Sequence, residues 1–234
     1  MIAGVIEKPT RRGRQIRCSA PFCPSRDFYS SMVRDGIPYV AIPVLVAMFP
    51  ILLGYWPISL VFFAVAAFMA FFFRDPRRTI PTEPGIIVAP ADGRVTLVNL
   101  AAGPADESLV SIFLSPLDVH LNRSPIAGTV TGVEYQKGKF LMATDKRARL
   151  ENEQNMLTIE GKELTVKCTQ IAGILARRIV CWKKVGERVE CGERFGMIKF
   201  GSRTDLLMPA TVKVAVKEGM KVRGGVTIIG RIKA

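Results

Sequence analysis

The sequence contains little of what many enzyme sites depend on. It has a single histidine, His120, so any chemistry that requires an imidazole must use that residue. Its five cysteines are odd in number and include no C-x-x-C pair. This pattern argues against a disulfide framework or a zinc site, and it predicts reduced thiols that face the cytoplasm. No apolar stretch lies close enough to the first residue to be read as a secretory signal peptide.

Acidic residues are scarce relative to basic ones. The 33 Lys and Arg residues against 20 Asp and Glu residues give a formal net charge of +13. Such an excess predicts an anionic partner. Nucleic acid is one such partner, but the hydrophobic content of 49% and one long uncharged stretch favour an anionic membrane surface instead. We therefore expect no nucleic-acid partner.

Charged residues are absent altogether from residues 36–73. This run is too long for one crossing, because a helix of about 20 residues already spans the hydrocarbon core. A Gly-Tyr-Trp-Pro cluster divides it into segments 37–53 and 58–73, which predicts a membrane-associated helical hairpin. Pro43 and Pro50 are expected to kink the first segment, so a shallow re-entrant insertion is an alternative. A buried pair of helices in a soluble protein is another.

Basic residues flank this apolar run on both sides. Arg34 precedes it, and three arginines lie among the five residues that follow it. The positive-inside rule then places both flanks in the cytoplasm. We expect a protein of the cell membrane with a basic extension at 1–35, a hairpin at 36–73 and a domain at 74–234 on the cytoplasmic side.

The part after residue 74 consists of short β-rich runs that alternate with Gly and Pro. This pattern is typical of an all-β domain. One segment, Ile171 to Cys181, is predicted to be helical. The fold class expected for the whole chain is mainly β, preceded by the N-terminal helical hairpin.

A weak internal repeat accompanies these strands. Residues 184–195 and 217–228 share a lysine, two glycines and a valine at the same spacing, and residues 89–95 resemble residues 124–130. Strands divided by glycine in this way look like the half-barrels of biotinyl- and lipoyl-type folds. The alternative is that short β-turns simply reuse the same residues.

Three segments carry reactive side chains in unusual surroundings. They contain Asp92 in A-P-A-D-G, His120 in S-P-L-D-V-H and Ser202 in F-G-S-R. The three could form a relay in which Asp92 orients His120 and His120 deprotonates Ser202. Asp118 is a second candidate for the orienting acid. Taken singly, each residue also has an ordinary explanation, as an Asp-Gly turn, a solvated histidine or a Gly-Ser turn.

The combination is more specific than its parts. Eight motifs occur in order: F-F-R-D-P-R-R at 72–78, A-P-A-D-G at 89–93, L-D-V-H with N-R at 117–123, G-K-F at 138–140, N-E-Q-N at 152–155, I-A-G at 171–173, A-R-R-I at 176–179 and F-G-S-R at 200–203. Over residues 34–234 the sequence resembles the short-form phosphatidylserine decarboxylases, which are carboxy-lyases.

The resemblance implies a proenzyme that cuts itself between Gly201 and Ser202 and converts Ser202 into a covalent pyruvoyl cofactor. His120 would be the base and Asp92 its orienting partner, with no pyridoxal phosphate and no metal. The chains 1–201 and 202–234 would stay associated, and a higher oligomer is compatible with the sequence. The implied substrate is phosphatidylserine in the membrane, decarboxylated to phosphatidylethanolamine through a Schiff base.

Some details depart from the pattern. Leu117 stands where some longer relatives have a second histidine, which leaves the proton donor after decarboxylation open. The F-G-S-R motif suits the short form, but it leaves archaeal-type ether phosphatidylserine as an alternative substrate. A membrane-anchored, lipoyl-like adaptor without activity and a serine hydrolase are the competing functions. Basic residues that could hold the headgroup phosphate, or simply form a solvated face, are Lys146, Arg147, Arg149, Arg177 and Arg178.

Overall fold

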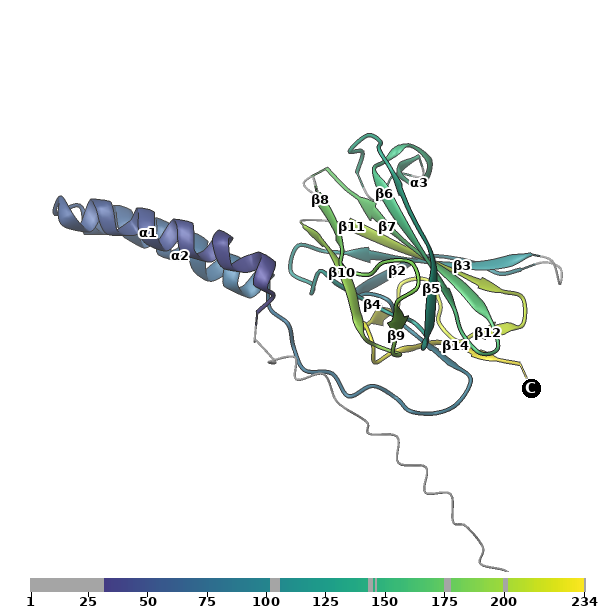
Figure 1. Ribbon diagram of the computed structural model, residues 1–234. Coiled ribbons are helices and arrows are strands. Elements are labelled where there is room, and N and C mark those ends of the chain that lie inside the picture. Colours follow the sequence, from purple (N-terminus) through teal and green to yellow (C-terminus); the bar gives the residue numbers. More distant parts are fainter. Residues whose placement is uncertain are drawn as a thin grey trace, which may run out of the picture.

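The computed structural model describes residues 32–101, 106–142, 145, 147–174, 178–199 and 202–233. Nearly all of the predicted N-terminal extension lies outside these residues. So does Gly201, whereas Ser202 is described. The described chain forms a pair of apolar helices and a β domain, joined by an extended linker (Figure 1).

Two long helices lie in the charge-free part of the sequence, and a short 3₁₀ helix directly precedes them. They are the 3₁₀ helix η1 (Arg34–Gly36), α1 (Ile37–Leu52) and α2 (Trp56–Phe72). We call α1 and α2 the helix pair, since they run antiparallel side by side (Figure 1). The Ser59 hydroxyl donates a hydrogen bond of 2.7 Å to the Ala47 carbonyl across the pair. Pro43 and Pro50 lie within α1, which continues through both of them.

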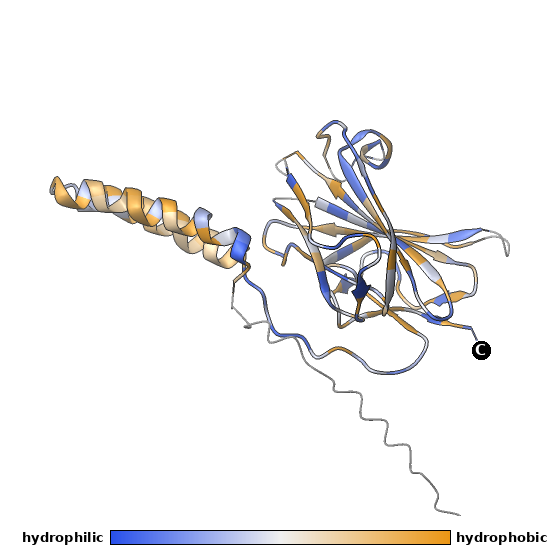
Figure 2. Ribbon diagram, viewed as in Figure 1, coloured by the Kyte–Doolittle hydropathy of each residue, from blue (hydrophilic) through white to orange (hydrophobic). Residues whose placement is uncertain are grey.

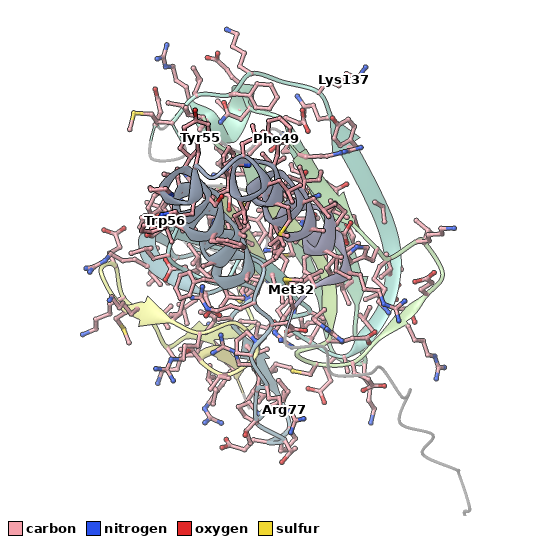
Figure 3. The ribbon with its side chains drawn as sticks, turned by 90° about the vertical axis from the view of Figure 1, so that its left-hand side faces the viewer. Met32, Phe49, Tyr55, Trp56, Arg77 and Lys137 are labelled. Atoms are coloured by element: carbon pink, nitrogen blue, oxygen red, sulfur yellow. The ribbon has the colours of Figure 1, made fainter. Side chains whose placement is uncertain are left out.

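Most of the helix pair is hydrophobic, and only its end next to the β domain is hydrophilic (Figure 2). Many of its large hydrophobic side chains are exposed, including Leu45, Phe49 and Leu52 of α1. The stretch Arg34–Leu52 is long and apolar enough to cross a membrane, and α2 is a somewhat shorter apolar helix. Figure 3 looks along the pair from its far tip, where Phe49, Tyr55 and Trp56 are nearest the viewer. A helix that is hydrophobic all round requires an apolar environment.

Within its described residues, the β domain contains one short helix, α3 (Ala148–Glu151), and fourteen strands. The strands are β1 (Ile86–Val88), β2 (Gly93–Asn99), β3 (Glu107–Leu114), β4 (Leu121–Arg123), β5 (Gly128–Gln136), β6 (Gln154–Glu160), β7 (Thr165–Ala172), β8 (Arg178–Cys181), β9 (Arg188–Val189), β10 (Arg194–Lys199), β11 (Ser202–Pro209), β12 (Val212–Val214), β13 (Lys221–Val222) and β14 (Ile228–Ile232). The prediction of a mainly β chain is confirmed.

Eight of these strands form one curled, half-barrel sheet in the order β13-β2-β3-β11-β7-β6-β5-β9. Two three-stranded sheets, β1-β14-β12 and β4-β10-β8, complete the domain, and the paired strands are antiparallel. The main core gathers the buried side chains of the curled sheet and of β1, β12 and β14; among them are Ile87, Val95, Ile112, Leu157, Leu206 and Ile229. The strand β11 lies between β3 and β7, so the residue that begins it is central to the sheet.

The helix predicted from Ile171 to Cys181 is wrong. The strand β7 ends at Ala172, and β8 begins at Arg178. Ala and Arg have good helix propensity, which is a weak local preference. Long-range pairing overrides it here, because Ile171 pairs with a residue of β11 and Ile179 pairs with Ile198 of β10.

The repeated segments occupy equivalent places in the fold. Gly186 donates its N–H to the Val130 carbonyl, and Gly219 donates in the same way to the Val95 carbonyl, each at 2.8 Å. These two glycines have φ angles of 90° and 86°, in the left-handed region that favours glycine. The strands that follow them, β9 and β13, form the two opposite edges of the curled sheet. The likeness to biotinyl- and lipoyl-type folds stays a prediction.

A second apolar cluster joins the helix pair to the β domain. Its buried members are Val33, Phe72, Phe73, Val119, Leu121 and Met197. Val33 lies just before the helix pair, and Phe72 and Phe73 lie where α2 ends. The other three belong to the β domain, in or just before β4 and in β10. The base of the helix pair is therefore packed against the part of the β domain that carries the only histidine.

Candidate active site

Ser202 is the first residue of β11 and pairs with Leu114 of β3 and Ala172 of β7. Its side chain is fully buried, and its Oγ has no hydrogen-bond partner in the described part of the chain. A buried hydroxyl without a partner costs about 1–3 kcal/mol. Such a group in a native structure calls for an explanation, and a catalytic role is one of the few that fit. The hydroxyl of Ser202 is thus buried, and no described residue forms a hydrogen bond with it.

A chain of buried polar side chains lies on the same face of the sheet. Thr204 Oγ1 accepts a hydrogen bond of 2.9 Å from Asn122 Nδ2, and Asn122 Oδ1 accepts one of 2.9 Å from Gln170 Nε2. Gln170 Oε1 accepts a third, of 3.1 Å, from Asn155 Nδ2. The sequence motifs do not identify these hydrogen-bonded side chains as a unit, and Gln170 belongs to none of the motifs. Gln170 lies in a strand that already contains Thr165, Lys167 and Thr169, so the sequence alone does not connect it to its distant partners.

His120 and Ser202 lie on neighbouring segments of the fold. The Ile198 N–H donates to the His120 carbonyl at 3.1 Å, which continues the β4–β10 pairing by one residue. Ile198 packs with Ala172, the residue that pairs with Ser202. The hydrogen bond between Asn122 and Thr204 also joins these two segments. A direct contact between His120 and Ser202 stays a prediction.

The imidazole of His120 is almost completely buried. Its Nδ1 lies 2.9 Å from the Asp118 carbonyl oxygen, and the ring of Phe72 lies against it. Burial lowers the pKa of His120 from 6.5 to about 4; the bond to Asp118 opposes this change, and the charge of Arg74 adds to it. At neutral pH the ring is therefore uncharged. With Nδ1–H donated to the carbonyl, Nε2 is the nitrogen that can accept a proton.

The carboxylate of Asp92 has two partners of its own. Its Oδ2 pairs with Arg78 Nη2 at 2.6 Å, and its Oδ1 accepts the Gly224 N–H at 2.7 Å. Gly93, the next residue, lies so close to β3 that it has no room for a side chain, because a Cβ there would lie 2.1 Å from the Phe113 carbonyl oxygen. The structure does not join this carboxylate to the imidazole by a hydrogen bond, and the orienting role of Asp92 stays a prediction.

The competing acid, Asp118, is also engaged. Its Oδ2 accepts the Ser115 N–H at 2.8 Å and closes the turn between β3 and β4. The contact between Asp118 and His120 is made by the backbone carbonyl, as described above. The side chain of Asp118 thus shapes the turn that carries His120.

The linker after α2 is tied to the site by ion pairs. Asp75 is buried and pairs with Arg194 and, at 3.0 Å, with Arg123, the residue that ends β4. Arg78 holds Asp92 as described. The linker carries the F-F-R-D-P-R-R motif, whose charged residues therefore connect the helix pair to the segments around His120 and Asp92.

The opposite face of β11 holds a second buried ion pair. Arg203 Nε pairs with Asp205 Oδ1 at 2.6 Å, and Arg203 Nη2 donates to Ser111 Oγ at 2.7 Å. Arg149 Nε lies 3.5 Å from Asp205 Oδ2. Because Arg203 directly follows Ser202, this network fixes the backbone on which the serine is carried.

Metal and thiol chemistry find little support in the described residues. No group of three or more His, Cys, Asp or Glu side chains within them could hold a metal ion. Cys168, Cys181 and Cys191 are free thiols, and burial raises the pKa of each, that of Cys191 to about 11.

Comparison with known proteins supplies the family. The family model for phosphatidylserine decarboxylase matches residues 65–230. A phosphatidylserine decarboxylase proenzyme of Pelodictyon phaeoclathratiforme is 45% identical over 206 residues, which cover 87% of this chain and 97% of the relative. Proteins of the same name from Chlorobaculum parvum (49% over 168 residues, 70% and 78% covered) and Symbiobacterium thermophilum (45% over 208 residues, 86% and 95% covered) are also similar.

The class of the protein follows from these matches: it is a carboxy-lyase. The chain belongs to the phosphatidylserine decarboxylase family. Family membership favours the enzyme over the non-enzymatic adaptor considered from the sequence.

Proposed function

We propose that this chain is a proenzyme that cuts itself between Gly201 and Ser202. The mature protein then decarboxylates phosphatidylserine to phosphatidylethanolamine and carbon dioxide, with a pyruvoyl group at position 202. The observation that carries the proposal is the buried hydroxyl of Ser202, which has no hydrogen-bond partner in the described structure. The relatives are named proenzymes, in keeping with maturation by cleavage.

The chain's own residues can carry out the cleavage. The uncharged imidazole of His120 takes the hydroxyl proton of Ser202, and the oxygen attacks the Gly201 carbonyl carbon. The peptide C–N bond breaks, the nitrogen of residue 202 gains a proton, and an ester replaces the amide. Removal of the α-hydrogen of residue 202 then expels residues 1–201 as a carboxylate. Water hydrolyses the remaining dehydroalanine to ammonia and a pyruvoyl group.

The surroundings of Ser202 fit such a group. The position is buried between β3 and β7, and the hydroxyl it replaces makes no hydrogen bond that would be lost. A pyruvoyl group supplies a ketone that condenses with the serine amine of the lipid and accepts the electron pair left by carbon dioxide. His120 is the proposed base, and Asp92 is its proposed orienting acid, with Asp118 as the competitor.

The sheet explains why both chains would stay together after cleavage. The small chain, residues 202–234, contributes β11 to β14. Strand β11 is hydrogen-bonded to β3 and β7, and β13 and β14 pair with β2 and β1. All four partner strands belong to residues 1–201. Cleavage at the start of β11 therefore removes one covalent bond but leaves the sheet pairing in place.

The helix pair is the proposed membrane anchor. We propose that residues 36–73 insert into the cell membrane and that residues 74–234 form the catalytic domain on the cytoplasmic side. The exposed apolar side chains of both helices support this placement. The membrane would then present the lipid substrate close to the site, since the base of the pair packs beside His120.

A denaturing gel tests the central claim. Purified wild-type protein is expected as chains of 201 and 33 residues, the smaller one blocked to Edman degradation. Ser202→Ala should remain one chain without activity. Ser108→Ala, which removes another buried serine hydroxyl from β3, should cut itself normally. An intact wild-type chain that nevertheless decarboxylates lipid would show that the proposed origin of the reactive group is wrong.

A further inference from the structure

Arg74 stands where α2 ends and the linker begins. Its Nη1 donates to the Phe71 carbonyl at 2.8 Å, and its Nη2 donates to the Leu117 carbonyl at 2.7 Å. The guanidinium carbon also lies 3.8 Å from the centre of the Phe71 ring. These contacts hold the planar group in one place, between the end of the helix and the turn that leads to His120.

The charge of Arg74 has no carboxylate in contact with it. Among the described residues it forms no ion pair, whereas Arg78 and Arg123 are paired with Asp92 and Asp75. The partners of Arg74 are neutral carbonyl groups and an aromatic face. A guanidinium has five N–H donors in a rigid plane, so donors remain for a further ligand. The charges of Asp92 and Asp118 act on Arg74 without an ion pair to either, so the immobilised guanidinium can still bind an anion.

The position of Arg74 indicates which kind of anion it would bind. Arg74 immediately follows the apolar helix pair, at the level where a membrane anchor meets the lipid headgroups. It is also close to the site, because its charge contributes to the lowered pKa of His120 and because Phe72, two residues earlier, lies against the imidazole. In Figure 1 the end of α2 meets the β domain on the side where β11 begins.

We propose that Arg74 binds an anionic oxygen of the lipid headgroup and so sets the headgroup beside His120 and Ser202. The phosphodiester and the carboxylate of phosphatidylserine share this chemistry, and a guanidinium can bind either through two parallel hydrogen bonds. The inference rests on the function proposed above and names the residue that would recognise the substrate.

The basic residues singled out from the sequence are less suitable. Arg147 pairs with Asp145 at 3.2 Å, and Arg149 lies 3.5 Å from Asp205. Arg178 is exposed on β8, whereas Lys146 and Arg177 lie outside the described residues. From the sequence Arg74 is only a flanking charge, because its hydrogen bonds to two carbonyl groups become visible only in three dimensions.

The test is steady-state decarboxylation in mixed detergent–lipid micelles with a varied surface concentration of phosphatidylserine. Arg74→Gln should raise KM about 10- to 100-fold, the loss expected for hydrogen bonds to a charged group, with a smaller change in kcat. Arg74→Lys should recover part of the loss, because it keeps the charge without the planar fork. Self-cleavage of both variants into two chains should match wild type.

Arg94→Gln is the matched control. Arg94 is an exposed arginine, whereas Arg74 is half-buried, but it too donates to a carbonyl, that of Gly219, and forms no ion pair among the described residues. The same rise in KM in Arg94→Gln would overturn the proposal, because it would reduce the effect to overall charge. An unchanged KM in Arg74→Gln would also overturn it. So would a failure of Arg74→Gln to cut itself, which would assign Arg74 to shaping the turn before His120.

Phosphatidylethanolamine, which has the phosphate but lacks the carboxylate, separates the two ligand groups. If Arg74 binds the phosphate, the inhibition constant of this lipid should rise in Arg74→Gln by the same factor as KM. If Arg74 binds the carboxylate, inhibition by this lipid should be unchanged while KM rises. Both results support an oxyanion site at Arg74.

Binding can also be measured without turnover. In the uncleaved Ser202→Ala background, calorimetry with soluble dihexanoyl-phosphatidylserine should show weaker binding when Arg74→Gln is added, and equal binding would overturn the proposal. A wild-type protein that neither cuts itself nor releases carbon dioxide would contradict the proposed function instead. The two failures are thus distinguished.

Discussion

The ring of Phe72, the last residue of α2, packs against the imidazole of His120, with ring centroids 4.3 Å apart and planes tilted by 34°. Phe72 and Val119, the neighbour of His120, belong to the cluster that joins the helix pair to the β domain. The helix that we propose as a membrane anchor therefore forms one wall around the proposed base. Burial is the main reason that this imidazole has a pKa of about 4.

Removal of that wall should change the pH dependence of self-cleavage. In Phe72→Ala, water reaches the imidazole, and the pKa of His120 should rise from about 4 towards 6.5. A base must be uncharged to accept a proton, so cleavage by the variant should slow between about pH 6.5 and 4, where the wild type still works, and should be similar above this range. The rate of appearance of the small chain after cell-free synthesis measures this. Phe72→Leu, which keeps most of the burial, is the control, and coincident profiles would refute the coupling.

The identity of the orienting acid should be resolved by amide substitutions. Asp92→Asn is expected to slow self-cleavage severely if its carboxylate orients or stabilises the imidazole in the reacting state. Asp118→Asn should cost less, because the Asp118 side chain caps the turn at Ser115 and an amide oxygen can still accept that hydrogen bond. Gels of the two variants decide the matter. Normal cleavage in Asp92→Asn together with failure in Asp118→Asn would reverse the assignment.

Local patterns predicted much of this architecture. The absence of charge from 36 to 73 predicted two apolar helices, and alternating short runs predicted the β domain. The helix expected at 171–181 failed because β7 and β8 are stabilised by β11 and β10, which lie far away in the sequence. Helix propensity depends only on residues close together in the sequence. Strand pairing in a curled sheet depends on residues that are far apart in the sequence.

In the candidate active site, too, local motifs indicate single residues, whereas the contacts between distant residues become visible only in the structure. The three candidate residues could be selected from the sequence because the motifs around Asp92, His120 and Ser202 are distinctive, and their catalytic roles stay predictions. Their neighbours could not, since the contact of Gln170 with Asn122 spans 48 residues and depends on how two sheets meet. The carboxylate of Asp92 pairs with Arg78, which no spacing rule predicts, and its role in orienting the imidazole stays a prediction.

The buried ion pair after Ser202 should be important for stability. Asp205→Asn leaves the buried guanidinium of Arg203 without its carboxylate, which is expected to cost about 3 kcal/mol or more. Thermal unfolding of the uncleaved Ser202→Ala chain in detergent measures the loss. Asp145→Asn removes an exposed partner of Arg147 and should leave the unfolding temperature unchanged. Equal unfolding temperatures for both variants would show that the pair contributes nothing.

The proposed topology has a direct test. If residues 36–73 form a membrane hairpin with basic flanks on one side, reporter fusions before Met1 and after Ala234 should both report cytoplasm. Deletion of residues 36–73 should release the β domain from membranes, although loss of Phe72 and Phe73 removes part of the apolar cluster near His120. Reporters on opposite sides would rule out the hairpin.

The proposed reaction predicts a covalent link between the lipid and the small chain. A ketone at position 202 condenses with the primary amine of the serine headgroup, and cyanoborohydride added during turnover should reduce the product to a stable adduct. Mass spectrometry should find the lipid mass on residues 202–234 alone, and the treated enzyme should be inactive. The uncleaved Ser202→Ala chain, which has no ketone, is the control and should remain unmodified.

The same chemistry limits which substrates can react. Phosphatidylserine acylated on its amine should not be decarboxylated, and pyridoxal phosphate should not restore activity to Ser202→Ala. Anionic lipid in the surface should raise the apparent rate of a protein with a net charge of +13, and added salt should weaken that effect, because salt screens attraction between exposed charges. Turnover of the N-acylated lipid, or activity without a trappable adduct, would rule out condensation with the amine. The family assignment would stand in either case, because it depends on the sequence matches and not on the mechanism.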